Sequence, residues 1–358
     1  MTALLPSRRA VRDAADTIGV ERVRAVRTKQ HQRTVVVVVA LVSFLLIMFC
    51  LALTVGDFPI SVQQVWMSLT GRGTRATDFI VHELRLPRAV IGIAVGACFG
   101  LSGAIFQSMM RNPLASPDII GITSGASAAA VIAILMLHLS GYAISAFAFG
   151  GALITALLIY LLAWKQGVAG YRLVLVGIGI AAMLGAIIDY LMTRAQIWDA
   201  QVALLWLTGS LNGASAAEMR PLLVLMIMTV PLALWAGGAL AGLQLGDDAA
   251  TSVGVRVERS RLFLILIGVA LASIATAAAG PIGFVAFVSG PIARRLTNGT
   301  GIALVPAALV GAAVVIAADF VGQHLLAVQL PVGILTAAVG APYLLYLLVR
   351  SNRIGHGG

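Results

Sequence analysis

Charge, cysteine and lysine are scarce in this sequence, and each shortage excludes a class of protein. Only 11% of the residues are charged and the mean hydropathy is +0.99, so a soluble fold would need an implausibly large core. The two cysteines, Cys50 and Cys98, lie inside apolar runs and indicate neither a disulfide framework nor a metal site. Neither of the two lysines, Lys29 and Lys165, follows a glycine, so the chain has no G-x-x-x-x-G-K phosphate loop and is not itself a P-loop ATPase.

Patterns that indicate catalysis or ion coupling are missing as well. The five histidines are scattered over the tail and loop regions, with no spacing that resembles a catalytic triad or a zinc site. Acidic residues deep inside apolar runs would mark proton or sodium coupling, but Asp118, Asp189 and Asp319 all fall near the ends of predicted spans. We therefore expect no catalytic residue, no metal and no cofactor, and an enzyme or a membrane scaffold has little support.

Long apolar runs dominate the sequence instead. Runs of about 20 residues, the length of helix that crosses a hydrocarbon core of about 30 Å, occur nine times. They lie at 34–55, 86–107, 116–137, 142–164, 171–193, 221–243, 261–280, 302–320 and 331–349. A further stretch, 281–290, reaches only about 15 Å as a helix. The expected fold class is all-α, a polytopic membrane protein of about ten transmembrane helices, one of them short or broken.

Positive charge predicts the orientation of these spans. Residues 1–33 form a basic tail directly before the first span, which we interpret as an uncleaved anchor. If 281–290 returns the chain to the starting side, 18 of the 24 Lys and Arg residues lie on that side, and otherwise 14 do. The positive-inside rule favours the first arrangement, with cytoplasmic tails at 1–33 and 351–358 and a ten-helix membrane domain at 34–350. A helix formed by the first tail on anionic lipid is an alternative.

Two features of the spans indicate how they pack. Gly92, Gly96 and Gly100 make two consecutive GxxxG steps on one face of the second span, which predicts close helix packing. The stretch IWDAQVALLWLTGSLNG at 197–213 is expected at the outer interface, as a helix or a re-entrant piece with belt tryptophans. A broken helix at membrane depth needs protein or a water-filled cavity to satisfy its backbone, so we expect an internal passage.

One charged segment interrupts the apolar pattern, LGDDAATSVGVRVERSR at 245–261. Six of the fifteen residues at 247–261 are charged, and the topology above puts them in the cytosol. We expect Asp247 or Asp248 to cap a short helix and Gly254 to end it. On these residues alone, the segment is either a solvated loop or a docking element for a separate subunit that supplies energy.

Several stretches resemble one known family. Residues 83–126, ELRLPRAVIGIAVGACFGLSGAIFQSMMRNPLASPDIIGITSGA, resemble the signature of the FecCD-type permeases, the membrane subunits of ABC importers for iron-siderophore chelates, haem and cobalamin. LGDDAATSVGVRVERSR, AGPIGFVAFV, IARRL, AADFVGQ and QLPVGILTAAVGAPY follow in the family's order. The resemblance covers about 34–350 and is strongest to permeases for ferric enterobactin and other ferric siderophores.

The resemblance implies a BtuC-like type II ABC importer permease fold in the bacterial cytoplasmic (inner) membrane. It implies partners as well: two cytosolic ABC ATPase subunits, a periplasmic or lipid-anchored substrate-binding protein, and a second permease subunit, identical or paralogous. Membrane lipid surrounds the chain, and no nucleic acid is expected. The implied substrate is a ferric siderophore; the alternatives are cobalamin or haem in the same family, or a secondary transporter driven by an ion gradient.

The family also implies roles for particular residues. A cytosolic coupling loop corresponds to 244–260. Its ATPase-coupling residues are Gly246, Asp247, Asp248, Ala249, Ala250, Val253, Gly254, Val255 and Arg259. The arginines of the family's RLPR motif contact acidic residues of the binding protein, which implies docking roles for Arg85 and Arg88, unless Arg88 only snorkels to the headgroups.

The sequence departs from the family pattern at two places. Gly290 and Pro291 stand where many relatives carry Pro-His, so no role for that histidine transfers to this chain. Gln323 stands where some relatives place a third docking arginine, and a partner permease would carry that charge instead.

Overall fold

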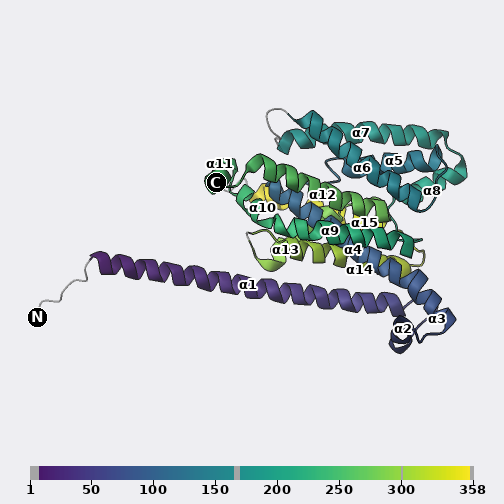
Figure 1. Cartoon of the computed structure of the whole chain (residues 1–358), viewed down its shortest axis with the longest axis horizontal. Helices are drawn as coiled ribbons and strands as arrows, with labels where there is room; N and C mark the ends of the chain where they lie inside the picture. Colours follow the sequence, from purple (N-terminus) through teal and green to yellow (C-terminus); the bar gives the residue numbers. More distant parts are fainter. Residues whose placement is uncertain (1–7, 165–169, 300, 355–358) are drawn as a thin grey trace, which may run out of the picture.

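The computed structural model describes residues 8–164, 170–299 and 301–354 as a bundle of helices (Figure 1). The predicted tails at 1–33 and 351–358 lie partly outside these residues, and Lys165 lies outside them. Most long helices lie side by side with their axes roughly aligned (Figure 1). Helix α11 and the C-terminal end of α15 lie at the same end of the bundle (Figure 1). Helices α2, α3 and α8 lie at the opposite end (Figure 1).

The bounds of the helices follow the apolar runs closely. In chain order they are α1 Arg8–Thr54, α2 Val62–Leu69, α3 Arg75–Phe79, the π-helix η1 Ile80–Arg85, α4 Leu86–Met109, α5 Ile122–Leu135, α6 Tyr142–Ala163, α7 Gly170–Arg194, α8 Ile197–Leu207, α9 Ala216–Trp235, α10 Gly237–Gln244, α11 Asp247–Ser252, α12 Val257–Ala279, α13 Val285–Thr297, α14 Leu304–His324 and α15 Val332–Ile354.

Within the described residues, seven helices are long and apolar enough to cross a membrane. They lie in α1, α3 to α4, α6, α7, α9, α12 and α14, and shorter apolar helices lie in α5, α8 and α15. The predicted all-α fold with many membrane helices is confirmed. The stretch at 197–213 contains a helix, α8, on which the Trp198 side chain is 78% exposed.

The described part of the basic tail is helical and continuous with the first span. Together they form α1, whose 47 residues correspond to about 70 Å, well beyond one bilayer thickness. Helix α1 extends past the bundle at the end where α11 lies (Figure 1). Arg33 fastens it there, because its Nε donates a hydrogen bond to the Leu296 carbonyl of α13 at 2.8 Å.

The span predicted at 116–137 is shorter than expected. Helix α5 has 14 residues, and the segment before it is irregular although Ala115 and Ser116 are buried. Pro113 and Pro117 explain the irregular segment, because proline supplies no backbone N–H and disfavours helix at the preceding residue. Irregular backbone is tolerated at membrane depth when protein surrounds it.

The broken helix predicted at 281–290 exists, but it begins and ends later. Helix α13 has 13 residues, about 20 Å, which is still less than the hydrocarbon core. Its start is delayed because Gly280 and Phe284 have positive φ angles, 70° and 66°, which do not continue a helix.

Gly290, one of the two departures from the family pattern, lies against Gln107 of α4. A side chain at 290 would collide with the Gln107 amide. That amide donates to the Phe287 carbonyl at 2.8 Å and accepts from Arg294 Nη2 at 3.2 Å. The absence of a side chain at position 290 therefore allows α13 to contact α4 through a buried polar side chain.

Helix α4 is the most enclosed helix of the bundle and packs against α12, α13 and α14. Gly96 and Gly100 face α14, where a Cβ on either residue would collide with the backbone of Gly311 or Ala307. Gly92 faces the side-chain end of Leu211 instead, at 3.0 Å from a Cβ. Two helix backbones therefore touch at Gly96 and Gly100, in a contact that only glycine permits.

We predict that Gly96→Ala lowers the midpoint of thermal unfolding in detergent. The added methyl has no space, and overpacking of this kind costs about 1–3 kcal/mol of unfolding free energy. Gly179→Ala on α7 is the matched control, because nothing lies within 4 Å of a Cβ there. Equal unfolding midpoints for the two variants would show that the α4–α14 contact is not needed for stability.

Candidate functional site

Residues 244–260, the predicted coupling loop, run from the last residue of α10 through α11 into the first turn of α12. The N-cap of α11 is Gly246, with φ 102°, and no side chain caps the helix. The prediction that Asp247 or Asp248 caps it is wrong, because both residues lie inside its first turn. Asp247 instead pairs with Arg261 of α12, whose Nη2 lies 3.0 Å from each carboxylate oxygen. This pair fastens the start of α11 to α12.

Gly254 ends α11 in a left-handed conformation, with φ 86°. The Gly254 N–H donates to the Thr251 carbonyl at 3.0 Å, and the Val255 N–H donates to the Ala250 carbonyl at 2.9 Å. This pair of bonds is a Schellman motif, which satisfies two carbonyls that the helix end would otherwise leave free. Ala250 is fully buried beneath the turn. The segment is therefore a rigid element.

The same segment presents a mixed acidic and apolar surface to its surroundings. Asp248 and Ala249 are exposed, and the side chains of Leu245 and Val253 are each 63% exposed. Of the nine predicted coupling residues, eight lie together at 246–255. Arg259 lies apart from them, exposed near the start of α12.

Sequence analysis missed one cation beside this segment, Arg111. It follows the end of α4 with a positive φ of 50°, and its Nη1 lies 3.5 Å from where a Cβ on Gly246 would be. Asn112 holds the turn, since its Oδ1 accepts a hydrogen bond from the Leu114 N–H at 2.9 Å. The turn after the C-terminal end of α4 therefore lies close to the start of α11. The RNP sequence after the second span was the available signal for this turn.

Arg85 lies at the opposite end of the bundle, at the end of η1, and it bonds within the chain. Its Nη1 donates to the Leu53 carbonyl at 2.9 Å, and its Nη2 donates to the Phe58 carbonyl at 2.6 Å. Arg85 thereby ties the C-terminal end of α1 and the segment before α2 to the helix that continues into α4.

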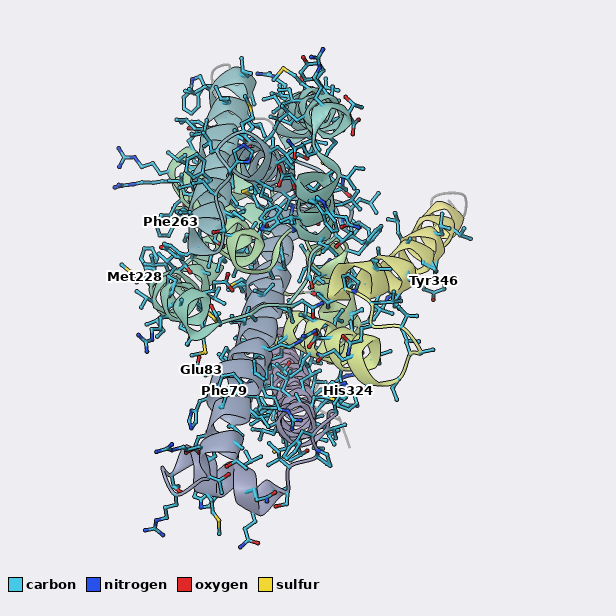
Figure 2. All side chains as sticks on the ribbon, turned by 90° about the vertical axis from the view of Figure 1, so that its right-hand side faces the viewer. Phe79, Glu83, Met228, Phe263, His324 and Tyr346 are labelled. Atoms are coloured by element: carbon cyan, nitrogen blue, oxygen red, sulfur yellow. The ribbon has the colours of Figure 1, made fainter. Side chains whose placement is uncertain are left out.

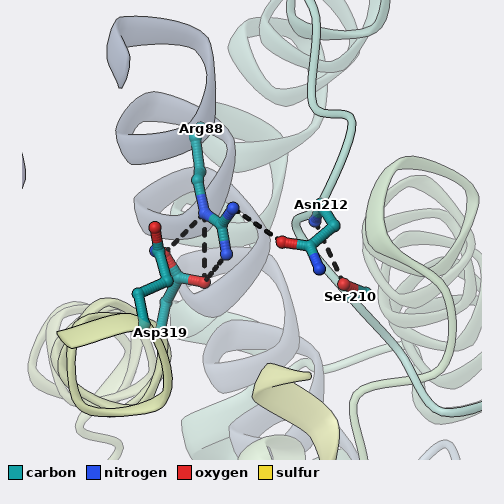
Figure 3. Close-up of polar contacts among 5 residues, drawn as sticks. Arg88, Ser210, Asn212 and Asp319 are labelled. Atoms are coloured by element: carbon teal, nitrogen blue, oxygen red, sulfur yellow. Dashed lines mark hydrogen bonds and ion pairs between the residues drawn. The ribbon is translucent and has the colours of Figure 1, made fainter. Parts of the chain in front are cut away.

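Arg88, one turn further, pairs with Asp319 of α14 (Figure 3). Its Nη2 lies 2.8 Å from Oδ1 and its Nε lies 3.0 Å from Oδ2, while its Nη1 donates to Asn212 Oδ1 at 2.7 Å. Gln323 donates to the same Asp319 carboxylate. The side chains of Arg88 and Asp319 are only 21% and 10% exposed. Both arginines with predicted docking roles therefore already have partners inside the chain.

The described residues offer no metal-binding cluster, since no three His, Cys, Asp or Glu side chains come together among them. The geometry thus consists of two separated polar regions, an acidic element at one end of the bundle and an arginine cluster at the other, joined by apolar helices.

A sequence model of the FecCD transport family matches residues 44–350. The chain belongs to the FecCD transport family. The resemblance inferred from the sequence motifs is confirmed, and the chain is a non-enzymatic, multi-pass membrane component of the permease type. The match begins within the first span and leaves the basic tail outside it.

Individual relatives agree with this family. The chain is 40% identical over 326 residues to the ferric enterobactin transport system permease protein FepG of Escherichia coli strain K12, over 90% of this chain and 98% of the relative. It is 36% identical to the iron(3+)-hydroxamate import system permease protein FhuG of Bacillus subtilis strain 168, over 88% and 97%. A chain of a metal-chelate type ABC transporter in an inward-facing conformation has a TM-score of 0.78 at 26% identity, over 87% of this chain and 98% of that chain. The BtuC-like permease fold is therefore confirmed.

We predict that Arg88→Ala destabilises the FecCD chain by about 3 kcal/mol, because it leaves the mostly buried Asp319 carboxylate without its cation. The double variant Arg88→Met/Asp319→Leu should be less destabilised than the single one, because neither charge remains. Thermal unfolding in detergent compares the two. A double variant as unstable as Arg88→Ala would argue against an energetically important ion pair.

Proposed function

We propose that this chain is the permease subunit of an ATP-driven importer that carries a ferric siderophore across the bacterial cytoplasmic membrane. Its relatives are named for transport of ferric enterobactin, achromobactin, iron(3+)-hydroxamate and ferric citrate, all of them iron chelates. The ferric enterobactin and achromobactin permeases are both 40% identical, and the match to the enterobactin permease covers more of that relative, 98% against 87%, which favours an enterobactin-like chelate. Cobalamin and haem are the alternative substrates within the family.

The observation that carries this proposal is the rigid α11 segment on a bundle with no nucleotide-binding loop of its own. A cytosolic ATPase that binds α11 would move more than a loop, because Asp247 is bonded to α12 and Gly246 lies close to Arg111 beyond the end of α4. Two ATPase subunits and a second permease subunit, identical or paralogous, complete the importer. In this importer α11 faces the ATPase, so α11 and both termini lie in the cytosol.

Transport then follows from movement of α11. When ATP brings the two ATPase subunits together, the α11 segment of each permease is displaced, and α12 moves with it through the Arg261–Asp247 pair. Because α12 packs along α4, the displacement reaches the centre of the bundle and changes which side the passage opens to. The substrate-binding protein delivers the chelate at the opposite end.

We predict that the variant Asp247→Ala/Asp248→Ala/Gly254→Leu lowers ATP-dependent uptake about 5- to 150-fold, the range of coupling free energies of 1–3 kcal/mol. The first two changes remove the bond to Arg261 and the acidic surface, and leucine at 254 strains the left-handed turn. ATP hydrolysis by the reconstituted complex should continue. Gly150→Leu on α6 is the control, because a Cβ there has open space and the φ of Gly150 is not positive. Wild-type uptake by the triple variant would exclude a coupling role.

A panel of substrates tests the transport proposal itself. In proteoliposomes with the ATPase, binding protein and second permease, uptake of ferric enterobactin should exceed that of a ferric hydroxamate, ferric citrate, cobalamin or haem. It should need ATP and resist an ionophore. Uptake that collapses with the ionophore and survives removal of the ATPase would identify a secondary transporter instead.

A further inference from the structure

A groove runs along the side of the bundle between α6 and α9, with α12 as its floor. Helix α12 lies between the other two helices (Figure 1) and packs against both. Two adjoining cavities of about 220 and 270 Å³ make up the groove. The residues that line both cavities are Ser145, Glu218, Ala277 and Ala278. Neither cavity contains a predicted coupling or docking residue, so the transport mechanism does not explain the groove.

The groove begins at the level of the membrane surface and continues into the apolar layer. Trp206 of α8 lines one end of it, and Trp198 on the same helix is exposed. Tryptophan is enriched where a membrane meets water. Glu218, in the first turn of α9, lies at that end as well. Leu225 lines the groove seven residues further along α9, which corresponds to about 10 Å of helix. A molecule in the groove therefore meets a polar end and an apolar end.

The walls of the groove belong to an apolar surface of the bundle. The outward sides of α6 and α9 carry exposed apolar side chains, among them Phe147, Ile154, Val224 and Met228. Met228 points away from the bundle (Figure 2). Each cavity is smaller than about 300 Å³, the volume at which pockets for drug-sized molecules begin. A narrow apolar groove in such a surface suits an extended acyl chain and is too small for a bulky chelate.

Glu218 is the one charged residue that lines the groove. Its carboxylate accepts a hydrogen bond from the backbone N–H of Ser215, and it takes part in no ion pair among the described residues. The nearest cation in the sequence is Arg220, but residues two apart on a helix do not face each other. A partly buried carboxylate beside apolar side chains is stabilised by a cation that replaces its lost water. The groove therefore has a place for a positively charged group at its polar end.

We propose that this groove binds a phospholipid with a primary ammonium headgroup, phosphatidylethanolamine. Its ammonium group donates to the Glu218 carboxylate, and the hydroxyls of Tyr142 and Ser145 on the α6 wall donate to phosphate oxygens. One acyl chain lies along α12 over Ala277 and Ala278. A lipid whose headgroup is only negative is disfavoured, because it brings a like charge to Glu218. This site is separate from the path of the chelate and does not depend on which chelate is carried.

The test measures the affinity of the purified full-length chain for defined lipids. Detergent micelles are titrated with phosphatidylethanolamine or phosphatidylglycerol, and native mass spectrometry counts the bound lipid. The wild type should bind phosphatidylethanolamine with a Kd about tenfold lower, the difference expected for one hydrogen bond to a charged group. Glu218→Gln should remove this preference. Glutamine still accepts the bond from the Ser215 N–H, so the start of α9 keeps its cap.

Two further variants locate the effect. Glu83→Gln makes the same change of charge at an exposed residue of η1, away from the groove, and should bind both lipids as the wild type does. Ala277→Leu fills the floor of the groove without changing any charge, and it should weaken the binding of both lipids.

Several results would overturn the lipid site. One is an equal Kd for the two lipids on the wild type, and another is a preference that Glu218→Gln retains. An equal loss in Glu83→Gln would show a general effect of surface charge, and full affinity in Ala277→Leu would show that the lipid binds elsewhere. The titration is repeated on the chain assembled with the ATPase and the second permease, where phosphatidylethanolamine should still bind. Its loss on assembly would show that a protein subunit covers the groove and would contradict the inference.

Discussion

The direct contact between the backbones of α4 and α14 is the constraint on which the rest of the molecule depends. Lipid tails are as apolar as leucine, so helices in a bilayer associate through close packing rather than through the hydrophobic effect. Gly96 and Gly100 provide that packing against Gly311 and Ala307. Helix α4 carries Arg88 in its first turn, and Arg111 follows its C-terminal end. The glycine contact therefore fixes the outer arginine cluster and the α11 region relative to each other.

Several charged side chains of this apolar chain join one helix to another. Arg88 pairs with Asp319 at the outer end of the α4–α14 contact, and Arg261 pairs with Asp247 where α12 meets α11. Arg85 joins the end of α1 and the segment before α2 to η1 through two backbone carbonyls. Each bond lies near an end of the bundle, where charge is tolerated and where a partner would bind. Movement of one element is thereby transmitted to its neighbours instead of being absorbed by a loose loop.

The sequence predicts the long helices well because their apolar runs must match the bilayer, and it predicts the position of α11 because charge is conspicuous there. Local geometry was less predictable. In the span predicted at 116–137 the helix begins only at Ile122, because Pro113 and Pro117 disfavour helix before it. Asp247 bonds to Arg261 rather than capping α11. The partners of Arg88 were not predictable, since Asp319 lies 231 residues away and no local pattern indicates the pairing. The internal partners of Arg88 are visible only in the folded chain.

The central claim is that α11 faces the cytosol and receives force from an ATPase. The most direct measurement is labelling of Ser252→Cys, an exposed position on α11, with a membrane-impermeant maleimide after Cys50 and Cys98 have been replaced. The account predicts labelling from the cytoplasmic side only, and protection when the ATPase is bound. Labelling from the periplasmic side of intact spheroplasts would show that the topology is inverted and would contradict the account.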